Sequence, residues 1–162
     1  CPLLPSPAWE NFSWKAKGYA FESIEAILKK ARSLGISLCI ENMFPQAHFL
    51  HQPHEFQPVF EAFSEILLAL DIGHANLGGG KNKSFEFIHL YGYRIGHVHA
   101  NDNFGKEDSH LPIGAGIIDF ERILRELKET QYDSTLTLEV FSRDRDYLKL
   151  SKEKIKKMWE TL

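Results

Sequence analysis

The sequence has few of the features that mark secreted, membrane-spanning or nucleic-acid-binding proteins. Its 162 residues include only two cysteines, Cys1 at the terminus and Cys39 inside an apolar run, so we expect no disulfide framework and a reducing, cytoplasmic location. No segment approaches the roughly 20 consecutive apolar residues that span a bilayer. The formal net charge of −3 lacks the basic excess of proteins held mainly by phosphate contacts. We therefore expect no membrane partner, and nucleic acid is a less favoured partner that the charge does not rule out.

The chain also lacks an amino-terminal methionine and a secretory signal, because it begins with Cys1 and no charged segment precedes a long apolar one. We interpret this start as truncated or processed. The composition, 43% hydrophobic and 25% charged, fits one soluble globular unit with a sizeable core. No linker or low-complexity tract divides the chain. We expect a single domain over residues 1–162, in which the proline-rich residues 1–18 form an irregular lead-in.

Strand and helix patterns alternate along the rest of the chain. Apolar residues recur at helical spacing from Phe21 to Leu34, and Gly35 follows as a stop signal. Short apolar runs predict strands over 36–40, 66–70, 95–100 and 135–140, with at most a short strand between 101 and 116. Further helices are predicted around 56–63, 85–90, 120–127 and 151–162. Repeated strand, loop and helix imply parallel strands joined by right-handed crossovers.

Acidic and histidine side chains gather at the carboxyl ends of the predicted strands. Alternation along residues 95–103 places His97, His99 and Asn101 on one face, which is too polar for ordinary core packing. The carboxyl ends of parallel strands form the ligand-binding edge of barrels and doubly wound sheets. The residues at or near these ends are Glu41, Asp71, His99 and Glu139, and the loops beyond them add His74, Asp108 and His110.

The strand-end set predicts a metal-centred active site. Three carboxylates and one imidazole, without a thiolate, suit Mn²⁺, Mg²⁺, Co²⁺ or Zn²⁺. Such an ion can hold neighbouring oxygens of a polyol and stabilise an enediolate. Glu41 and Glu139 lie on strands far apart in order, so in a closed barrel they would face each other, and one could remove a carbon-bound proton while the other returns it. Thr135 and Thr137 share the parity of Glu139 and indicate a polar inner face.

Five motifs resemble the second half of the xylose isomerase-like TIM barrels. That superfamily includes sugar isomerases and epimerases, inosose dehydratase and endonuclease IV. The resemblance implies a parallel (β/α) barrel of which strands four to eight are present, with Glu41, Asp71, His99 and Glu139 as the metal ligands of strands four, five, six and eight. The motifs are Leu38-Cys-Ile-Glu-Asn42, Leu70-Asp-Ile-Gly-His74, His97-Val-His-Ala-Asn-Asp102, Asp108-Ser-His-Leu-Pro-Ile-Gly-Ala-Gly116 and Leu136-Thr-Leu-Glu-Val-Phe141.

The resemblance also implies roles for single residues. In tagatose epimerase-like members, the residues matching Glu41 and Glu139 form the acid/base pair, and the residue matching His74 touches substrate oxygens.

We expect His110 and Asn101 to bind substrate as well. In endonuclease IV, the residues matching His74, Asp108 and His110 are additional zinc ligands of a three-metal cluster that cleaves DNA beside abasic sites. His97 is expected to lie one layer deeper than His99 and to support it.

The chain departs from the family in length, because a TIM barrel usually needs about 250 residues and strands one to three are missing. Two parallel edges would be exposed, at the strands of Glu41 and Glu139. We therefore expect a homo-oligomer, a half-barrel that docks with a separate N-terminal half, or a gene fragment with impaired activity. The predicted function is a divalent-metal-dependent sugar or sugar-phosphate isomerase or epimerase. The alternatives are an endonuclease IV-like zinc phosphodiesterase and a non-catalytic half-barrel module.

Two loops have more than one interpretation. The turn at Gly114-x-Gly116 precedes a helix and could bind a phosphate through backbone amides, or it could be a simple tight turn. His48, His51 and His54 follow Glu41 in sequence and could cover the site, but solvated loop histidines are the favoured interpretation.

Overall fold

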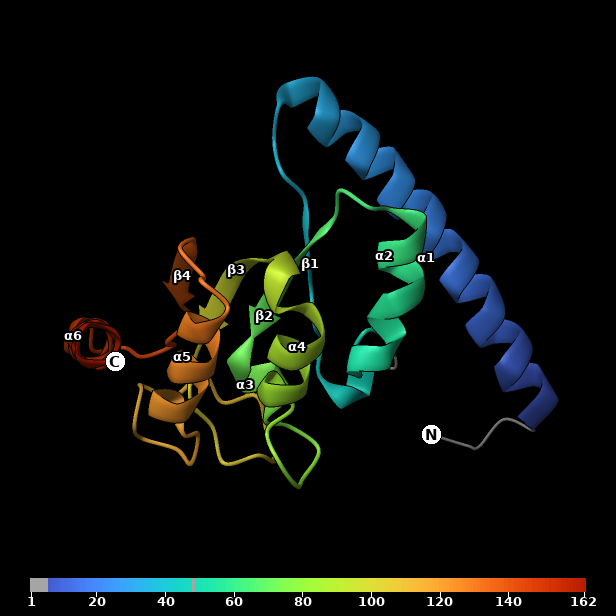
Figure 1. The fold of residues 1–162 in the computed structure, drawn as a ribbon. Coiled ribbons are helices and arrows are strands. Elements are labelled where there is room, and N and C mark those ends of the chain that lie inside the picture. The colour runs from blue at the N-terminus through green and yellow to red at the C-terminus, as the bar shows by residue number, and fades with distance from the viewer. Residues whose placement is uncertain (1–5, 48) are drawn as a thin grey trace.

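Four parallel strands form one sheet in the computed structural model (Figure 1), which describes residues 6–47 and 49–162 and the side chains from residue 18 onward. Each strand pairs in parallel with the next strand of the chain, in the order β1-β2-β3-β4. The parallel α/β architecture expected from the sequence is confirmed. The strands are β1 (Cys39–Glu41), β2 (Leu67–Asp71), β3 (Ile95–Ala100) and β4 (Thr135–Leu138).

Helices connect the strands, as parallel pairing requires. Figure 1 shows α1 running alongside α2 at the β1 side of the sheet, and α6 beyond β4 at the other side. The helices are α1 (Ser6–Leu34), α2 (Gln57–Ala62), α3 (Ile72–Ala75), α4 (Ser84–Tyr91), α5 (Phe120–Glu129) and α6 (Asp146–Thr161). Short 3-10 turns cover Pro45–Ala47, Pro53–Phe56 and Gly92–Arg94. None of the helices in the described part of the chain combines the length and apolarity that crossing a bilayer requires.

The hydrophobic core lies between one face of the sheet and the connecting helices. Leu68, Leu70 and Val98 point from the strands into this layer and are fully buried, because alternate residues of a strand face the same side. Helical residues such as Phe87 and Leu124 close the layer from outside. Each such side chain contributes about 1.5–3 kcal/mol through burial. The core therefore fixes the strands and leaves their other face for the polar side chains.

The irregular lead-in expected over residues 1–18 is wrong from residue 6 onward, because α1 begins at Ser6. Pro7 lies in the first turn of this helix, where a missing backbone N–H costs no hydrogen bond and the proline ring favours helical φ. Prolines and aromatic residues concealed the helix in the sequence pattern. Residues 1–5, which include Cys1, lie outside the described residues.

The short strand allowed for between residues 101 and 116 does not form. A single antiparallel bridge joins Asp102 and Leu111, and β3 pairs directly with β4. The described part of the barrel therefore contains four consecutive strands, not the five implied by numbering them four to eight. The physical reason is that the Asp102 carboxylate, which is fully buried, folds the segment into a compact loop.

The Asp102 carboxylate accepts four backbone N–H groups of this loop. Its Oδ2 accepts those of Gly114 and Gly116, both at 2.9 Å, and its Oδ1 accepts those of Asn103 at 2.9 Å and Ile118 at 3.2 Å. The two glycine amides are thus already hydrogen-bonded, so the phosphate interpretation of this turn is wrong and the tight-turn interpretation holds. A Cβ on Gly116 would lie 2.4 Å from the Asn103 carbonyl oxygen, so the turn requires glycine there.

We expect Asp102→Ala to lower the free energy of unfolding by roughly 3–5 kcal/mol, because four backbone N–H groups lose a charged acceptor. The measurement is urea unfolding followed by circular dichroism. The matched control is Asp119→Ala, since Asp119 caps α5 by accepting the Arg122 N–H at 3.1 Å from an exposed position, where a lost cap costs about 1 kcal/mol. Equal destabilisation by the two substitutions would contradict the anchoring role of Asp102.

Candidate metal centre and active site

Four side chains from the carboxyl ends of the strands converge at one edge of the sheet. They come from β1, β2, β3 and the residue that follows β4, and one ligand-type atom of each lies within 4.8 Å of all the others. The parallel register places Asp71 directly opposite His99, and the two glutamates reach in from the outer strands. The structure thus brings together the set that the sequence singled out as candidate ligands, Glu41, Asp71, His99 and Glu139.

The imidazole of His99 lies at the centre of this set. Its Nδ1 is 3.0 Å from Glu41 Oε1, 3.3 Å from Glu139 Oε1 and 3.8 Å from Asp71 Oδ2. The hydrogen bond to Glu41 raises the pKa of His99, and the surrounding negative charge adds to this effect although burial opposes it. Three carboxylates around one nitrogen form a concentrated negative site that favours a cation.

Asp71 is the most enclosed member of the set, with no exposed surface. Burial raises its pKa to about 6, and the charges of Glu41 and Glu139 act in the same direction, while His74 opposes them. Glu41 behaves differently, because its hydrogen bond with His99 and the nearby imidazole charges outweigh burial and lower its pKa. A buried carboxylate with a raised pKa beside further carboxylates is typical of a functional site.

Two asparagines that touch Asp71 lie behind it. Asn42 exchanges two hydrogen bonds with the Asp71 backbone, a contact that the sequence did not reveal because an asparagine after a strand resembles an ordinary loop residue. Asn101 was expected to bind substrate, but it is fully buried, and its Nδ2 lies 3.5 Å from Asp71 Oδ2. Asn101 also packs so closely on Gly73 that a Cβ there would lie 2.1 Å from its Oδ1. Both asparagine side chains are thus buried beside a candidate ligand and have no surface with which to touch a bound molecule.

His97 lies on the same face of β3 as His99, and the two rings meet edge to face with centroids 5.0 Å apart. Its nitrogens pair with two hydroxyls of β4, Nδ1 with Thr135 Oγ1 at 2.7 Å and Nε2 with Thr137 Oγ1 at 3.0 Å. The threonines are exposed and His97 is half-buried. The polar inner face indicated by the sequence is therefore present. His97 contacts His99 there from a half-buried position beside exposed threonines, not from an enclosed deeper layer.

A second cluster adjoins the first and consists of His74, Asp108 and His110. The Nε2 atoms of the two imidazoles lie 3.2 and 3.1 Å from the same oxygen, Asp108 Oδ2. Their Nδ1 atoms face main-chain carbonyls, that of Asn42 at 2.9 Å for His74 and that of Glu139 at 2.8 Å for His110. A carbonyl can only accept, so each Nδ1 carries the proton.

In the neutral rings both Nε2 lone pairs then point at a carboxylate. Such a group of acceptors needs a shared proton or a cation. Asp108 Oδ1 is also buried without a hydrogen-bond partner in the described part of the chain. Despite burial, the charges of Asp71, Asp108 and Glu41 together with the Asn42 hydrogen bond raise the pKa of His74.

Two aromatic side chains border the second cluster. Phe141 stacks on His110 with ring centroids 4.1 Å apart and an interplanar angle of 15°, and Phe44 meets His74 edge to face at 5.3 Å. His110 adopts a left-handed backbone conformation with φ of 45°, which costs a non-glycine residue about 1–2 kcal/mol. Such strain is characteristic of functional sites.

The loop histidines are arranged differently from one another. His54 is exposed, as expected for a solvated side chain, whereas His51 is half-buried with its Nδ1 3.2 Å from Glu55 Oε2. His48 lies outside the described residues. Neither His51 nor His54 belongs to the two candidate metal-binding groups of the described residues.

Comparison with known proteins places this geometry in a family. The sequence matches the family described as "Xylose isomerase-like TIM barrel" over residues 5–160. An uncharacterized protein of Methanocaldococcus jannaschii is 33% identical over 159 residues, which covers 91% of this chain and 54% of that protein. The chain thus spans about half the length of the curated relatives it matches.

Solved structures show the same fold. A D-tagatose 3-epimerase-like protein is 31% identical with a TM-score of 0.80, over 98% of this chain and 59% of that one. An L-ribulose 3-epimerase, 21% identical, shares the fold with a TM-score of 0.68 over 87% of this chain and 53% of that one. The structural neighbours are therefore sugar epimerases and their relatives. The chain belongs to the xylose isomerase-like TIM barrel family, of whose barrel it forms a four-stranded part.

Proposed function

We propose that this chain is the metal-binding part of a sugar or sugar-phosphate isomerase or epimerase that requires a divalent cation. The observation that carries the proposal is the convergence of Glu41, Asp71, His99 and Glu139 within 4.8 Å. It occurs in a chain that is 31% identical to a D-tagatose 3-epimerase-like protein. The small number of cysteines supports a cytoplasmic setting.

The four side chains would hold the cation as one nitrogen and three oxygen donors, a set that suits Mn²⁺, Mg²⁺, Co²⁺ or Zn²⁺. The donor chemistry fits, because three carboxylates face His99 Nδ1 and burial raises the pKa of Asp71 to about 6. A divalent cation bound there supplies positive charge that offsets the negative charge developing on substrate oxygens.

Proton transfer is assigned to the two glutamates. Glu41 and Glu139 are 31% and 28% exposed, whereas Asp71 is fully enclosed, so the glutamates are the carboxylates of the set that reach a bound molecule. They extend from the two outer strands of the sheet. One would remove the proton from the carbon next to a sugar carbonyl to give an enediolate, and the other would return a proton.

The remaining assignments follow from burial and contacts. His74 and His110 would bind substrate oxygens through their Nε2 atoms, which meet at Asp108 Oδ2 in the second cluster. Asn101 would act as a positioning residue for Asp71, since it has no exposed surface with which to touch a substrate. The exposed inner face at Thr135 and Thr137 supports a partner half-barrel, either a second copy or a separate N-terminal half.

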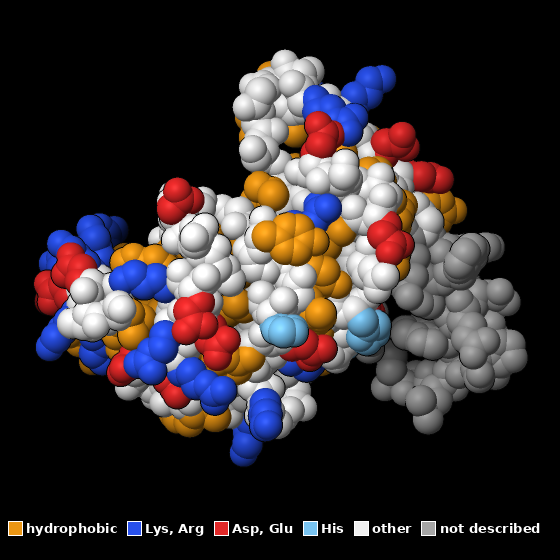
Figure 2. Space-filling model, in the orientation of Figure 1, with side chains coloured by type: hydrophobic (Ala, Val, Ile, Leu, Met, Phe, Trp, Pro, Cys, Tyr) orange, Lys and Arg blue, Asp and Glu red, His pale blue; other side chains and the backbone are white. Residues whose placement is uncertain are grey.

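One observation favours a second candidate function. The cluster of His74, Asp108 and His110 could hold further ions, as an endonuclease IV-like zinc phosphodiesterase that acts at abasic sites in DNA would require. On the face drawn in Figure 2, however, acidic and basic side chains are interspersed, and the net charge is −3. These charges favour the sugar over a polyanion.

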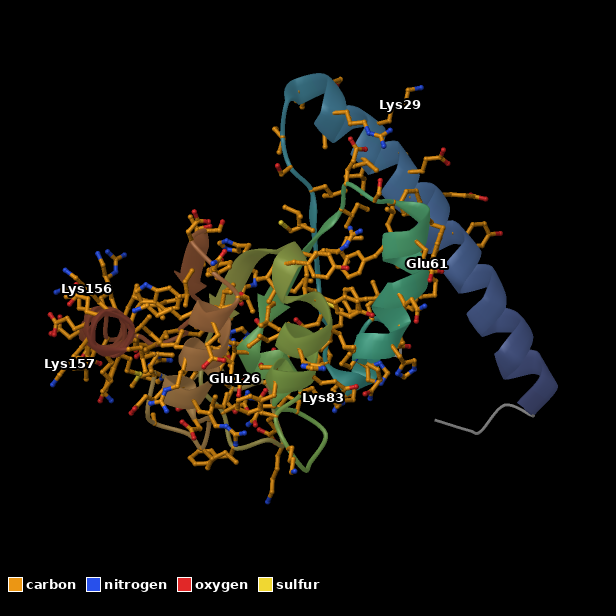
Figure 3. All side chains as sticks on the ribbon, in the orientation of Figure 1. Lys29, Glu61, Lys83, Glu126, Lys156 and Lys157 are labelled. Carbon is orange, nitrogen blue, oxygen red and sulfur yellow. The ribbon has the colours of Figure 1, made fainter. Side chains whose placement is uncertain are left out.

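Metal content per chain separates these functions. We expect about one divalent ion per chain after dialysis, measured by plasma mass spectrometry, and loss of that ion in Glu139→Ala because one of four donors is removed. The matched control is Glu61→Ala in α2 (Figure 3), whose side chain is exposed and belongs to neither candidate metal-binding group of the described residues, so this variant should keep the ion. About three zinc ions per wild-type chain would contradict the isomerase in favour of the nuclease. A wild-type chain without any bound ion would support a non-catalytic half-barrel.

The proton-transfer step predicts isotope exchange. D-tagatose incubated in D₂O with the protein and Mn²⁺ should gain deuterium at carbon 3, detected by NMR, because the glutamate that removes the proton exchanges it with solvent. Glu41→Gln and Glu139→Gln should each lower the exchange rate by about 10²-fold or more, since an amide cannot accept the proton. Glu61→Gln should leave the rate unchanged. Exchange that persists in both glutamate variants would exclude this pair as the acid and base.

The raised pKa of Asp71 predicts a pH-dependent stability of the metal-free protein. An unfolded aspartate titrates near 3.9 and the folded one at about 6, so ionisation between about pH 4 and 6 is disfavoured in the folded state. Relative to Asp71→Asn, the wild-type free energy of unfolding should fall by about 3 kcal/mol across this range. Urea unfolding at several pH values measures the difference. A difference that does not change with pH would contradict the burial effect.

A further inference from the structure

We propose that Asn42 is a positioning residue that ties the first cluster to the second. Its side chain holds the backbone of Asp71, and its main-chain carbonyl fixes the orientation and tautomer of His74. The proposal rests on the proposed function in one respect, because it takes Asp71 to be a metal ligand.

The side chain of Asn42 takes the place of a peptide group at the end of β1. The last residue pair of the β1–β2 ladder is Glu41 with Ala69, so the backbone groups of Asp71 extend beyond the end of β1. Asn42 Oδ1 accepts the Asp71 N–H at 2.8 Å, and Asn42 Nδ2 donates to the Asp71 carbonyl at 2.9 Å. Both residues are fully buried. The carboxamide thus satisfies two buried backbone groups that no strand residue reaches.

The Asn42 N–H still donates to the Ala69 carbonyl at 3.3 Å, while the Asn42 carbonyl faces α3. This carbonyl accepts the Nδ1–H of His74 at 2.9 Å, which leaves Nε2 without a proton in the neutral ring and 3.2 Å from Asp108 Oδ2. The ring of contacts closes where the His74 backbone N–H donates to Asp71 Oδ1 at 2.7 Å. Asn42, Asp71 and His74 thus form one unit of four hydrogen bonds.

This unit of hydrogen bonds connects the two clusters through Asn42. Asp71 belongs to the first cluster and His74 to the second, and neither can shift without breaking a bond to Asn42. Only an asparagine side chain offers a donor and an acceptor at this length, because aspartate cannot donate when ionised and glutamine is one methylene longer. Residues that orient metal ligands in this way typically change metal affinity by 10–100-fold when substituted.

The test uses Co²⁺ as the probe and two buried asparagines. Asn42→Ala should weaken Co²⁺ binding about tenfold or more and change the visible absorption spectrum of the bound ion. The matched control is Asn76→Ala, since Asn76 is also buried, 9% exposed against 0% for Asn42, but donates to Asn103 Oδ1 at 2.9 Å. Its Co²⁺ affinity should stay within twofold of the wild type, although both variants lose stability in urea. Wild-type affinity and spectrum in a folded Asn42→Ala protein would overturn the positioning of Asp71.

The second half of the proposal is tested without any metal. Nitrogen-15 NMR of the metal-free wild-type protein at pH 9, where imidazoles are neutral, should show His74 with a protonated Nδ1 and an unprotonated Nε2, assigned by comparison with His74→Gln. The opposite tautomer would overturn the role of the Asn42 carbonyl. A wild-type protein that binds no Co²⁺ would refute the proposed function and the ligand-positioning half, whereas the tautomer result would stand independently.

Discussion

The parallel register of the four strands is the constraint on which the rest of the structure depends. Because β2 and β3 place Asp71 opposite His99, two polar residues from separate motifs meet without any loop having to bring them together. The outer strands add one glutamate each at the same edge. The negative charge gathered there is tolerable only where hydrogen-bond donors and a cation can reach it. The donors are the His99 imidazole, the Asn101 amide and the His74 backbone N–H.

The loop after β3 is organised by a different carboxylate. Asp102 collects four backbone N–H groups, and α6 holds the same loop from the other side. Ser151 Oγ accepts the Ile113 N–H at 3.1 Å, and Lys154 Nζ donates to the Ile113 carbonyl at 2.8 Å. The last helix of the chain thus fixes the segment that carries the second cluster, although it contributes no side chain to either candidate metal-binding group of the described residues.

Much of this arrangement could be predicted from the sequence, and the failures have identifiable causes. Strand ends were visible because apolar runs switch abruptly to acids and histidines, as at Asp71 and His99, and parallel pairing then brings such ends together. The start of α1 was hidden by prolines and aromatic residues that break the helical period. The loop built on Asp102 and the role of Asn42 depend on side-chain bonds to distant backbone groups, which no periodicity reports.

The backbone at His110 carries a consequence for how sequences of this kind would diverge. A left-handed conformation with φ of 45° strains most residues that bear a Cβ, whereas glycine fits it freely and asparagine fits it with less strain than other side chains. In a chain that no longer used the imidazole, random substitution at this position would drift toward those residues and gain stability. Retention of histidine at position 110 would therefore distinguish lineages that still use the site from lineages in which only the fold survives.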